Sequence, residues 1–371
     1  MLSGAVWRPY TPAREDADPR KHFCLRASGN FLKTSSQSQN VTKPNSSQVP
    51  PPESATPELS IIIVNWRSAD FVLRCVRSIG DNLTGLAYEV IVVDNASFDG
   101  CDAVLRRNGL AVTYLQCDQN LGFARANNHG CRAARGSNVL FLNPDTEVVG
   151  PAISLLHAEL IRLPTTGAVG ARLLNADGSL QTSCIQAFPN ILNQALDSEY
   201  FRQKWPASGL WGTRAFLHDG GEPEEVEAIS GACLMMKRDV FERVGGFSED
   251  YFMYGEDMDL CYRVKLAGCK NVYVPQATVV HFGGGSSKQT PSDFSIVMMR
   301  ESIWRFIRTT RGKLCGTAYR LVMLVSAVCR LGMLSVVFLT KRAKGSGLVA
   351  ESSMRKWWTI LRWSFGAATV R

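Results

Sequence analysis

The sequence lacks the cysteine pattern of a protein that is built on disulfides. Its eleven cysteines include no Cys-x-x-Cys pair, and an odd total in a chain of 371 residues argues against a disulfide framework. The N-terminal residues also lack the continuous apolar stretch and small-residue cleavage site of a secretory signal. We therefore expect a protein of a reducing compartment, on the cytoplasmic side of a membrane.

Acidic residues are nearly absent from the C-terminal segment. Between Arg300 and Arg371 the sequence has 14 Lys and Arg but only two acidic residues, which gives a net charge of +12. Since the whole chain carries +8, the residues before Arg300 carry −4. The positive charge therefore belongs to this segment, and we do not expect nucleic acid as a partner.

Apolar residues are scarce in residues 1–57, which are rich in Ser, Pro, Asn and Gln. Such a segment cannot bury enough apolar surface to offset the loss of chain entropy. The remainder of a chain that is 45% hydrophobic overall is long enough to form a substantial core. We expect a disordered leader over 1–57, a folded domain over 58–290 and a basic, amphipathic helical tail over 291–371.

Buried strands and amphipathic helices alternate at the start of the folded domain. The stretch "ELSIIIVNW" is a short continuous apolar run, typical of a strand that is covered on both faces. Helix and strand patterns then alternate through "ADFVLRCVRSIGDN", "YEVIVVDNAS", "VTYLQC", "LGFARANNHGCRAARG" and "NVLFLN". This order predicts an α/β fold with a mostly parallel central sheet. A further helix is expected at about 151–162, and a hairpin around Asp177-Gly178.

Polar side chains gather where the predicted strands end. Ligands of open α/β sheets bind beyond the carboxyl ends of the strands. The residues expected at this edge are Asn65, Asp94, Asn95, Asn120, Asn143 and Asp145. The carboxylate of Asp94 suits the base or ribose of a nucleotide, although a helix cap or a turn would also explain it.

Two of the expected site residues suit a metal ion. "LFLNPDTEV" ends a strand in Asn143-Pro144-Asp145, where oxygen ligands suit Mg2+ or Mn2+, although these are also ordinary turn residues. His281 ends a later strand, just before Phe282 and a run of glycines. It is either a further metal ligand or a structural histidine.

Three carboxylates crowd the start of a predicted helix in "FMYGEDMDLCYRVKLAG". The helix dipole favours acidic residues at this position, so Glu256, Asp257 and Asp259 are explained by capping alone. The apolar residues just before them would also raise a carboxylate pKa, which suits a general base. Asp259 lies four residues before Arg263, so we expect these two to form an ion pair.

The tail contains a 19-residue apolar run, Leu321 to Leu339, that is interrupted by Arg330. An Arg near the centre of a membrane span costs about 2.5–3.5 kcal/mol on insertion scales. A span, a helix in the membrane interface and a helical hairpin packed on its own domain are therefore all open. The nearby Trp and basic residues favour contact with a membrane surface.

Together, these motifs resemble the family-2 glycosyltransferases of the GT-A fold, in particular the rhamnosyltransferase-like branch. The resemblance covers roughly residues 59–287. It is carried by "SIIIVNW", "EVIVVDNASFDG", "NLGFARANNHG", "LFLNPDTEV", "ISGACLMMKRDVFERVGGFSEDYFMYGEDMDLCYRVKLAG" and "VVHFGG".

The resemblance implies roles for the residues already singled out. Asp94 would hold the base of a nucleoside-diphosphate sugar, in a pocket formed with Asn65, Asn95, Gly122, Phe123 and Asn127. Asp145 and His281 would bind the metal, and Asn143 stands where the family usually has the first acid of an Asp-x-Asp motif. Asp257 would be the base, with Glu256 beside it.

The reaction implied is an inverting transfer of a sugar to a hydroxyl of a glycan or a polyprenyl-linked glycan. dTDP-rhamnose is the favoured donor. Residues 184–228, which include several aromatics, would bind the acceptor and close over it. The enzyme would sit peripherally on the inner face of the cell membrane, with residues 321–339 as an alternative membrane anchor.

Two other functions compete with this one. A sugar nucleotidyltransferase usually has a glycine- and arginine-rich loop after its first strand, but "NWRSADF" contains no glycine. A non-catalytic membrane-associated protein that binds nucleotide sugars or glycans would be favoured by loss of the acids. Asp94, Asp145, Glu256 and Asp257 are all present.

Overall fold

The computed structural model describes residues 56–181, 183–197, 204–205, 208, 210, 221–283, 293–342 and 348–367. These residues belong to one compact unit, Ala55–Val370. The predicted disordered leader lies outside the described residues except for Thr56 and Pro57.

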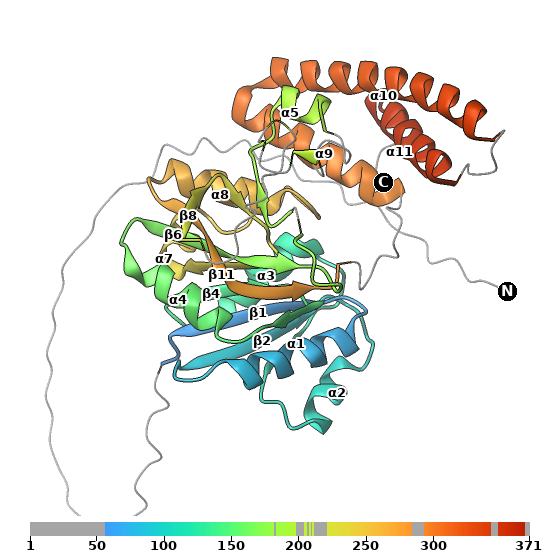
Figure 1. The fold of residues 1–371 in the computed structure, drawn as a ribbon. Helices are drawn as coiled ribbons and strands as arrows, with labels where there is room; N and C mark the ends of the chain where they lie inside the picture. Colours follow the sequence, from blue (N-terminus) through green and yellow to red (C-terminus); the bar gives the residue numbers. More distant parts are fainter. Residues whose placement is uncertain are drawn as a thin grey trace, which may run out of the picture. The chain divides into compact units, whose positions relative to one another are not determined.

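Parallel strands form the first half of the central sheet, as the alternating pattern predicts (Figure 1). β1 (Leu59–Asn65) pairs in parallel with both β2 (Tyr88–Asp94) and β4 (Asn138–Leu142). β3 (Thr113–Gln116) extends the sheet beyond β2. Every residue of β1 is buried, because both faces of this strand are covered.

The second half of the sheet mixes strand directions. β10 (Cys233–Lys237) runs antiparallel to both β4 and β6 (Thr166–Leu174). β11 (Lys270–His281) is parallel to β6 but antiparallel to β5 (Thr146–Val148) and β8 (Glu224–Val226). The order is β3-β2-β1-β4-β10-β6-β11-β5, with β8 on β11, so only β5, β8 and β10 oppose the common direction. The sheet is mostly parallel, as predicted.

Helices cover the sheet on both faces. They are α1 (Ala69–Asn82), α2 (Cys101–Arg107), α3 (Gly122–Ala133), α4 (Ala152–Arg162), α7 (Arg238–Arg243) and α8 (Glu256–Leu266). α3 lies close to the sheet because Gly130 has no side chain: an added Cβ would lie 2.6 Å from the Ile62 side chain. The small residues of this helix therefore set its distance from β1.

The segment from 184 to 228 contains only short elements where it is described. β7 (Ile185–Gln186) pairs with β9 (Ala228–Ile229), and α5 (Ile191–Ala195) starts with a capping box between Asn190 and Asn193. This agrees with the irregular pattern of the sequence. Its aromatic residues Phe201, Trp211 and Phe216 lie outside the described residues. The hairpin expected just before it is present, with Gly178 in its turn and a bridge between Leu174 and Leu180.

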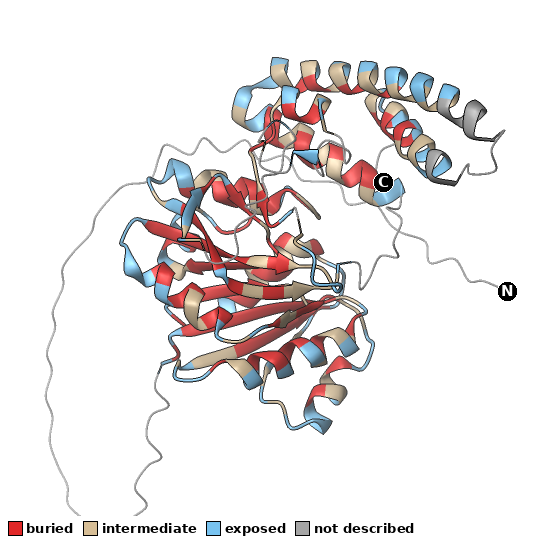
Figure 2. Ribbon diagram, in the orientation of Figure 1, coloured by how far each residue is buried: buried red, intermediate tan, exposed pale blue. Residues whose placement is uncertain are grey.

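The described C-terminal residues are helical, as predicted. α9 (Asp293–Arg311), α10 (Lys313–Arg342) and α11 (Leu348–Ser364) share an apolar core of their own (Figure 2). Its buried members are Ile296, Val297, Ile303, Ile307, Tyr319, Met323, Ala327, Trp357, Ile360 and Trp363. Phe306 of α9 also stacks on Phe188, with ring centroids 5.9 Å apart, so the helices contact the domain that precedes them.

Candidate active site

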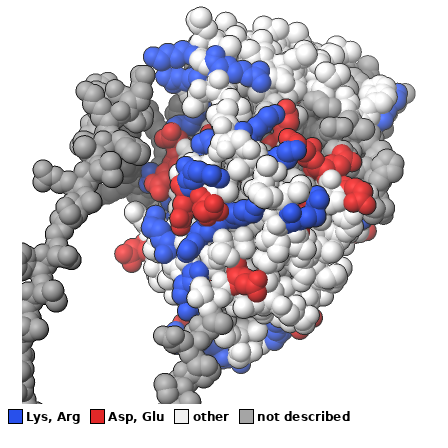
Figure 3. Space-filling view, turned by 90° about the vertical axis from the view of Figure 1, so that its left-hand side faces the viewer, with Lys and Arg blue, Asp and Glu red and all other residues white. Residues whose placement is uncertain are grey.

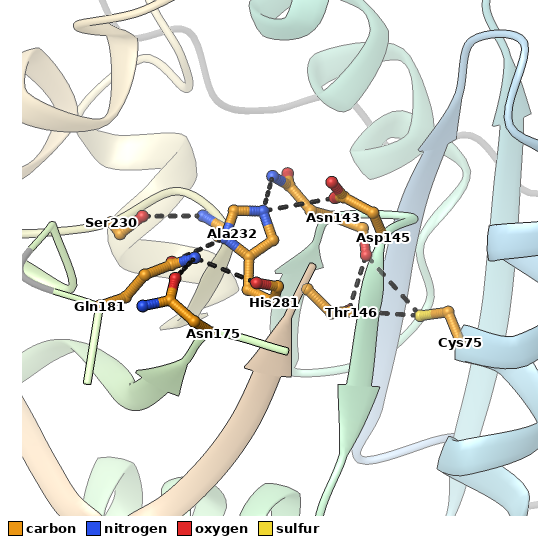
Figure 4. A network of polar contacts seen from close by, with 9 residues as sticks. All are labelled: Cys75, Asn143, Asp145, Thr146, Asn175, Gln181, Ser230, Ala232 and His281. Carbon is orange, nitrogen blue, oxygen red and sulfur yellow. Dashed lines mark hydrogen bonds and ion pairs between the residues drawn. The ribbon is translucent and has the colours of Figure 1, made fainter. Parts of the chain in front are cut away.

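The strand register brings Asp145 and His281 together. β5 and β11 pair antiparallel with His281 opposite Thr146, which places the imidazole beside the turn that follows β4. His281 Nε2 lies 3.3 Å from Asp145 Oδ1 (Figure 4). Their side chains are only 16% and 12% exposed. The two residues that the sequence predicts as metal ligands are thus neighbours at one edge of the sheet.

Gln181 orients the imidazole, a role that no pattern in the sequence predicted. His281 Nδ1 lies 2.9 Å from Gln181 Oε1, an oxygen that can only accept, so Nδ1 carries the proton. Gln181 Nε2 in turn donates to the carbonyl of His281 and to Asn175 Oδ1. The other ring nitrogen, Nε2, faces Asp145, and a metal-binding histidine is usually oriented in this way, by a hydrogen bond at its second ring nitrogen.

Asn143 contacts the same imidazole. Its Nδ2 lies 3.3 Å from His281 Nε2 and its backbone nitrogen donates to the carbonyl of Ala232. With the amide in this orientation, Asn143 helps to position His281 and presents no oxygen toward it. The departure from an acid at this position is thus compatible with a supporting role.

The donor set fits a divalent cation that also binds substrate. Within the described residues, no three His, Cys, Asp or Glu side chains gather into a metal site. Mg2+, however, commonly takes one or two protein ligands and completes its shell with phosphate oxygens and water. A carboxylate and a prepared imidazole nitrogen, Asp145 and His281, meet that requirement beside a diphosphate.

Asp257 is held in place by backbone amides at the start of α8. Its Oδ2 accepts a hydrogen bond from the Gly231 nitrogen at 2.9 Å, and its Oδ1 accepts one from the Met258 nitrogen at 2.8 Å. Burial raises the pKa of Asp257, and these two bonds partly oppose the rise. An oriented carboxylate with a raised pKa suits proton abstraction.

Glu256 is more deeply buried than its neighbour. Its Oε2 finds no hydrogen-bond partner among the described residues. Burial, and then the charge of Asp257, raise the pKa of Glu256 well above its usual range. The pair therefore favours one neutral and one ionised carboxyl group, an arrangement that separates acid and base roles.

A three-residue loop before β10 connects these two groups of residues. The Gly231 nitrogen donates to Asp257, while the carbonyl of the next residue, Ala232, accepts from the Asn143 nitrogen at 2.9 Å. Figure 4 shows Ser230 and Ala232 in one polar network with Asn143 and His281. The loop from Ser230 to Ala232 thus joins the candidate base to Asn143, which contacts His281 and stands two residues before Asp145.

Asp94 organises the loop that follows β2. Its Oδ1 accepts hydrogen bonds from Asn65 Nδ2 at 3.0 Å and from the Ser97 nitrogen at 3.3 Å. Asn65 Nδ2 also reaches Asp99, an acid that the sequence interpretation left out. Asp94 and Asn65 are both fully buried, so this geometry agrees with the turn reading of Asp94. Its direct contact with a nucleotide stays a prediction.

Asn95 and Gly122 join the predicted nucleotide loops to one another. Asn95 Oδ1 accepts from the Leu121 nitrogen, and its Nδ2 donates to Asn120. Gly122 has a φ of +79°, and an added Cβ would lie 2.5 Å from the carbonyl oxygen of Phe252, in the segment that leads to α8. Only glycine allows this approach.

Phe123 and Asn127 belong to α3. The Phe123 nitrogen donates to the carbonyl of Phe252 at 2.9 Å, and the buried Asn127 donates to the Phe123 carbonyl one turn earlier. These bonds give Asn127 a place inside the helix. That Phe123 and Asn127 line the pocket for the sugar nucleotide stays a prediction.

Four non-glycine residues of the described chain have positive φ, and all lie in loops of this region. They are Arg67 after β1, Ala96 and Phe98 after β2, and Tyr254 just before α8. Such backbone is energetically unfavourable for these residues and clusters at functional sites. Phe98 is also 71% exposed, a feature that no sequence pattern indicated.

Asp259 lies apart from this chemistry. Arg263 Nε lies 2.8 Å from its Oδ2, which confirms the predicted ion pair. Arg263 also donates to the carbonyls of Val244 and Gly246. Asp259 thus anchors α8 against the end of α7, and only two of the three crowded acids remain for the site.

A sequence model of glycosyl transferase family 2 matches residues 60–245, half of the chain. The chain belongs to this family. A model of the N-terminal domain of galactosyltransferase also matches, over residues 214–283. The predicted family and the prediction of a glycosyltransferase are therefore confirmed.

Curated members of the family include two rhamnosyltransferases that resemble the chain. It is 31% identical over 250 residues to N-acetylglucosaminyl-diphospho-decaprenol L-rhamnosyltransferase of Mycobacterium tuberculosis (strain CDC 1551 / Oshkosh), covering 64% of this chain and 80% of that protein. It is 27% identical over 249 residues to Rhamnosyltransferase WbbL of Escherichia coli (strain K12), covering 60% and 82%. These names support the predicted rhamnosyltransferase-like branch and a place in polysaccharide biosynthesis.

Solved structures agree on the fold. The mannosyltransferase PcManGT of Pyrobaculum calidifontis, in complex with GDP-Man and Mn2+, superposes with a TM-score of 0.50 at 18% identity, covering 85% of this chain and 86% of that one. GalNAc-T7 with UDP, GalNAc and Mn2+ also gives 0.50, at 16% identity, covering 69% and 48%. The GT-A fold predicted for this glycosyltransferase is confirmed.

Proposed function

We propose that this family-2 glycosyltransferase moves a sugar, with L-rhamnose from dTDP-rhamnose as the expected donor, to a hydroxyl of a lipid-linked glycan. The two rhamnosyltransferase relatives support this donor, and the name of the mycobacterial relative describes a diphospho-decaprenol acceptor. The observation that carries the proposal is the connection of Asp257, through the loop from Ser230 to Ala232, to Asn143, which contacts His281 of the Asp145–His281 pair.

The chemistry is a single displacement with inversion. The acceptor oxygen attacks the anomeric carbon from the face opposite the diphosphate. The bond between the anomeric carbon and the diphosphate oxygen breaks, and its electron pair leaves with the diphosphate. Asp257 takes the proton of the acceptor hydroxyl. Its raised pKa increases the proton affinity of the carboxylate, which favours acceptance of this proton, while its backbone hydrogen bonds fix the direction of the side chain.

Asp145 and His281 would hold Mg2+ or Mn2+ in this enzyme. When bound, the cation would supply positive charge beside the leaving diphosphate. The chain's own contribution is preorganisation, because Gln181 and Asn143 hold the imidazole of His281 toward Asp145 before substrate arrives. The Mn2+ in the two structural relatives supports this assignment.

The acceptor also bears on where the enzyme works. A polyprenyl-linked glycan is confined to a membrane, so we place the enzyme on the cytoplasmic membrane surface. The basic character of the C-terminal segment, which carries +12 from Arg300 onward, supports this location. Residues 184–228 are the proposed acceptor region, and within them the carbonyls of Ala195 and Asp197 accept hydrogen bonds from Arg330 of this segment.

A donor screen tests the proposal. The full chain is incubated with a panel of sugar nucleotides and a polyprenyl-diphosphate glycan, with divalent metal present or removed by chelation, and release of nucleoside diphosphate is measured. Acceptor-dependent release is expected from dTDP-rhamnose, and only with metal. Release from another sugar nucleotide would identify that compound as the donor in place of dTDP-rhamnose. Absence of release from all of them would favour the non-catalytic alternative.

A further inference from the structure

The long helix α10 has two faces of different character. One face is buried against α9 and α11 through Tyr319, Met323 and Ala327. The opposite face is exposed and apolar, and most of its residues recur at spacings of three, four or seven, which form one stripe along a helix. This stripe consists of Leu314, Leu321, Val325, Val328, Met333 and Val336, each more than half exposed.

No charged side chain interrupts the stripe. Every side chain from Leu314 to Val336 is described, and the other exposed residues inside this range are Thr317, Cys329 and Gly332. The two cations within the range, Arg320 and Arg330, are only partly exposed and contact protein groups. A stripe of this length, with aliphatic side chains and no charge, is unusual on a surface that faces only water.

Basic side chains outnumber acidic ones near the stripe. Exposed Arg311 and Lys313 precede it, and the adjoining α11 exposes Trp358 and Arg362, together with Arg355, which pairs with Asp293, and one acid, Glu351. The uppermost part of Figure 3, where α10 lies, shows Lys and Arg side chains but no Asp or Glu. Aliphatic, tryptophan and cationic groups together match the surface of an anionic bilayer. A second copy of the chain would bring the same positive charge and be repelled.

The contacts of Arg330 indicate how α10 would be oriented in such a bilayer. By length and composition, Lys313–Val336 is the one described segment able to cross a membrane. Yet Arg330 donates to the carbonyls of Ala195, the last residue of α5, and Asp197, at 3.0 and 2.8 Å, and its guanidinium lies 4.4 Å from the Trp357 ring. A helix that crossed the bilayer would have to leave these partners. Arg330, which interrupts the apolar run, thus holds α10 against the rest of the protein.

A second arginine strengthens the same connection. Arg300 of α9 is buried, donates to Gln194 Oε1 at 3.1 Å and lies 3.6 Å from Asp197 Oδ2. Two cations, from α9 and α10, therefore hold the four residues Gln194–Asp197. These residues belong to the segment proposed to bind the acceptor.

We propose that α10 lies flat in an anionic lipid surface, with the stripe from Leu314 to Val336 in the lipid. On the opposite side of α10, Arg330 holds Gln194–Asp197 and so positions the acceptor segment at the membrane. The lipid contact stands on the stripe and its charges alone. The positioning role of Arg330 rests on the proposed function.

Vesicle sedimentation of the full chain tests the lipid contact. The wild type is compared with L321Q/V325Q/V328Q and with V149Q/I161Q/L266Q, a matched change at exposed apolar positions outside the C-terminal helices. Phosphatidylcholine vesicles with phosphatidylglycerol should bind the wild type and the matched control, and the stripe variant at least about tenfold less. Equal binding by all three proteins, or equal binding to vesicles of phosphatidylcholine alone, would overturn the contact.

Two further measurements distinguish a lipid surface from a second copy of the chain and a flat orientation from a membrane span. Light scattering without lipid should give the same mass for the wild type and the stripe variant, whereas a dimer that only the variant loses would assign the stripe to a second copy. An alkaline carbonate wash should release the wild type from vesicles. Its retention would indicate a span and contradict the flat orientation.

Arg330→Gln tests the positioning role. Because Arg330 lies opposite the stripe, the variant should bind vesicles like the wild type and bind donor nucleotide with unchanged affinity. The KM for a lipid-linked acceptor should rise several-fold, and Arg330→Lys should restore part of it. An unchanged KM would remove Arg330 from this role, while lack of transfer by the wild type itself would instead contradict the proposed function. Circular dichroism shows whether both variants fold.

Discussion

His281 Nε2 lies 3.3 Å from Asp145 Oδ1, although the two residues come from distant parts of the chain. Antiparallel pairing of β5 with β11 produces this contact, because His281 stands opposite Thr146 in the register. A slip of one residue would turn the imidazole to the other face of the sheet. Strand register, more than the local turn, therefore sets the geometry of the candidate metal site.

Gln181 should matter for metal binding although it does not approach the metal position itself. Gln181→Leu removes the acceptor for His281 Nδ1, so the imidazole loses its fixed orientation and proton position. We expect the affinity for Mn2+, titrated in the presence of nucleoside diphosphate, to fall about 10–100-fold. Gln276→Leu, an exposed change on the same strand β11, should leave it unaltered. Equal affinities for the two variants would show that Gln181 is not needed.

Gly122 should tolerate no side chain. In Gly122→Ala, the new Cβ meets the carbonyl oxygen of Phe252 and the residue keeps a positive φ. The free energy of unfolding should fall by about 2–5 kcal/mol in urea titration, from crowding and backbone strain together. Gly178→Ala is the matched control, since its φ is +81° but nothing lies within 4 Å. Gly178→Ala should lose only about 1–2 kcal/mol. Similar losses for the two variants would contradict the close approach of Gly122 to the Phe252 carbonyl.

Glu256 should make stability depend on pH. Burial raises its pKa well above the ordinary value of 4.5, so its ionisation costs more in the folded than in the unfolded chain. Stability is therefore lost as the pH rises from 4.5 through the folded pKa. Glu256→Gln removes this cost and should raise stability at neutral pH by about 1 kcal/mol, with no gain below the unfolded pKa. Thermal melts across this range measure it; a gain that did not vary with pH would contradict the assignment.

The transfer rate should follow the ionisation of Asp257. A base acts only when deprotonated, and burial raises the pKa of this carboxyl above its ordinary value of 3.8. Under saturating substrates, kcat should therefore rise with pH along an acid limb that lies above the range of an ordinary aspartate. A limb in the ordinary range would mean that a different group, or an unperturbed Asp257, controls proton transfer.

Local patterns predicted much of the fold because they act through burial. The apolar runs at β1, β2 and β4 required cover on both faces, and the structure buries each of these strands in the sheet. The insertion of β10, antiparallel between β4 and β6, carries no local signal, because its apolar residues fit either direction. The loop from Ser230 to Ala232 takes its importance from that insertion.

The partners of the site residues were harder to predict than the residues themselves. Asp145, His281 and Asp257 stand out by type and position. Gln181 acts only because a hairpin returns beside the end of β11, and Arg330 finds Ala195 and Asp197 only after three helices have packed. Such contacts depend on tertiary placement, which spacing along the chain does not encode.

The most direct test of the account measures Asp257→Asn beside Asp259→Asn on the same helix. Donor affinity is determined by calorimetry and single-turnover transfer is followed with the lipid-linked acceptor. Asp257→Asn should bind donor like the wild type yet transfer about 10²–10⁴-fold more slowly, whereas Asp259→Asn should lose stability but keep its rate in the folded protein. Transfer by Asp257→Asn at the wild-type rate would contradict the central claim that Asp257 is the base.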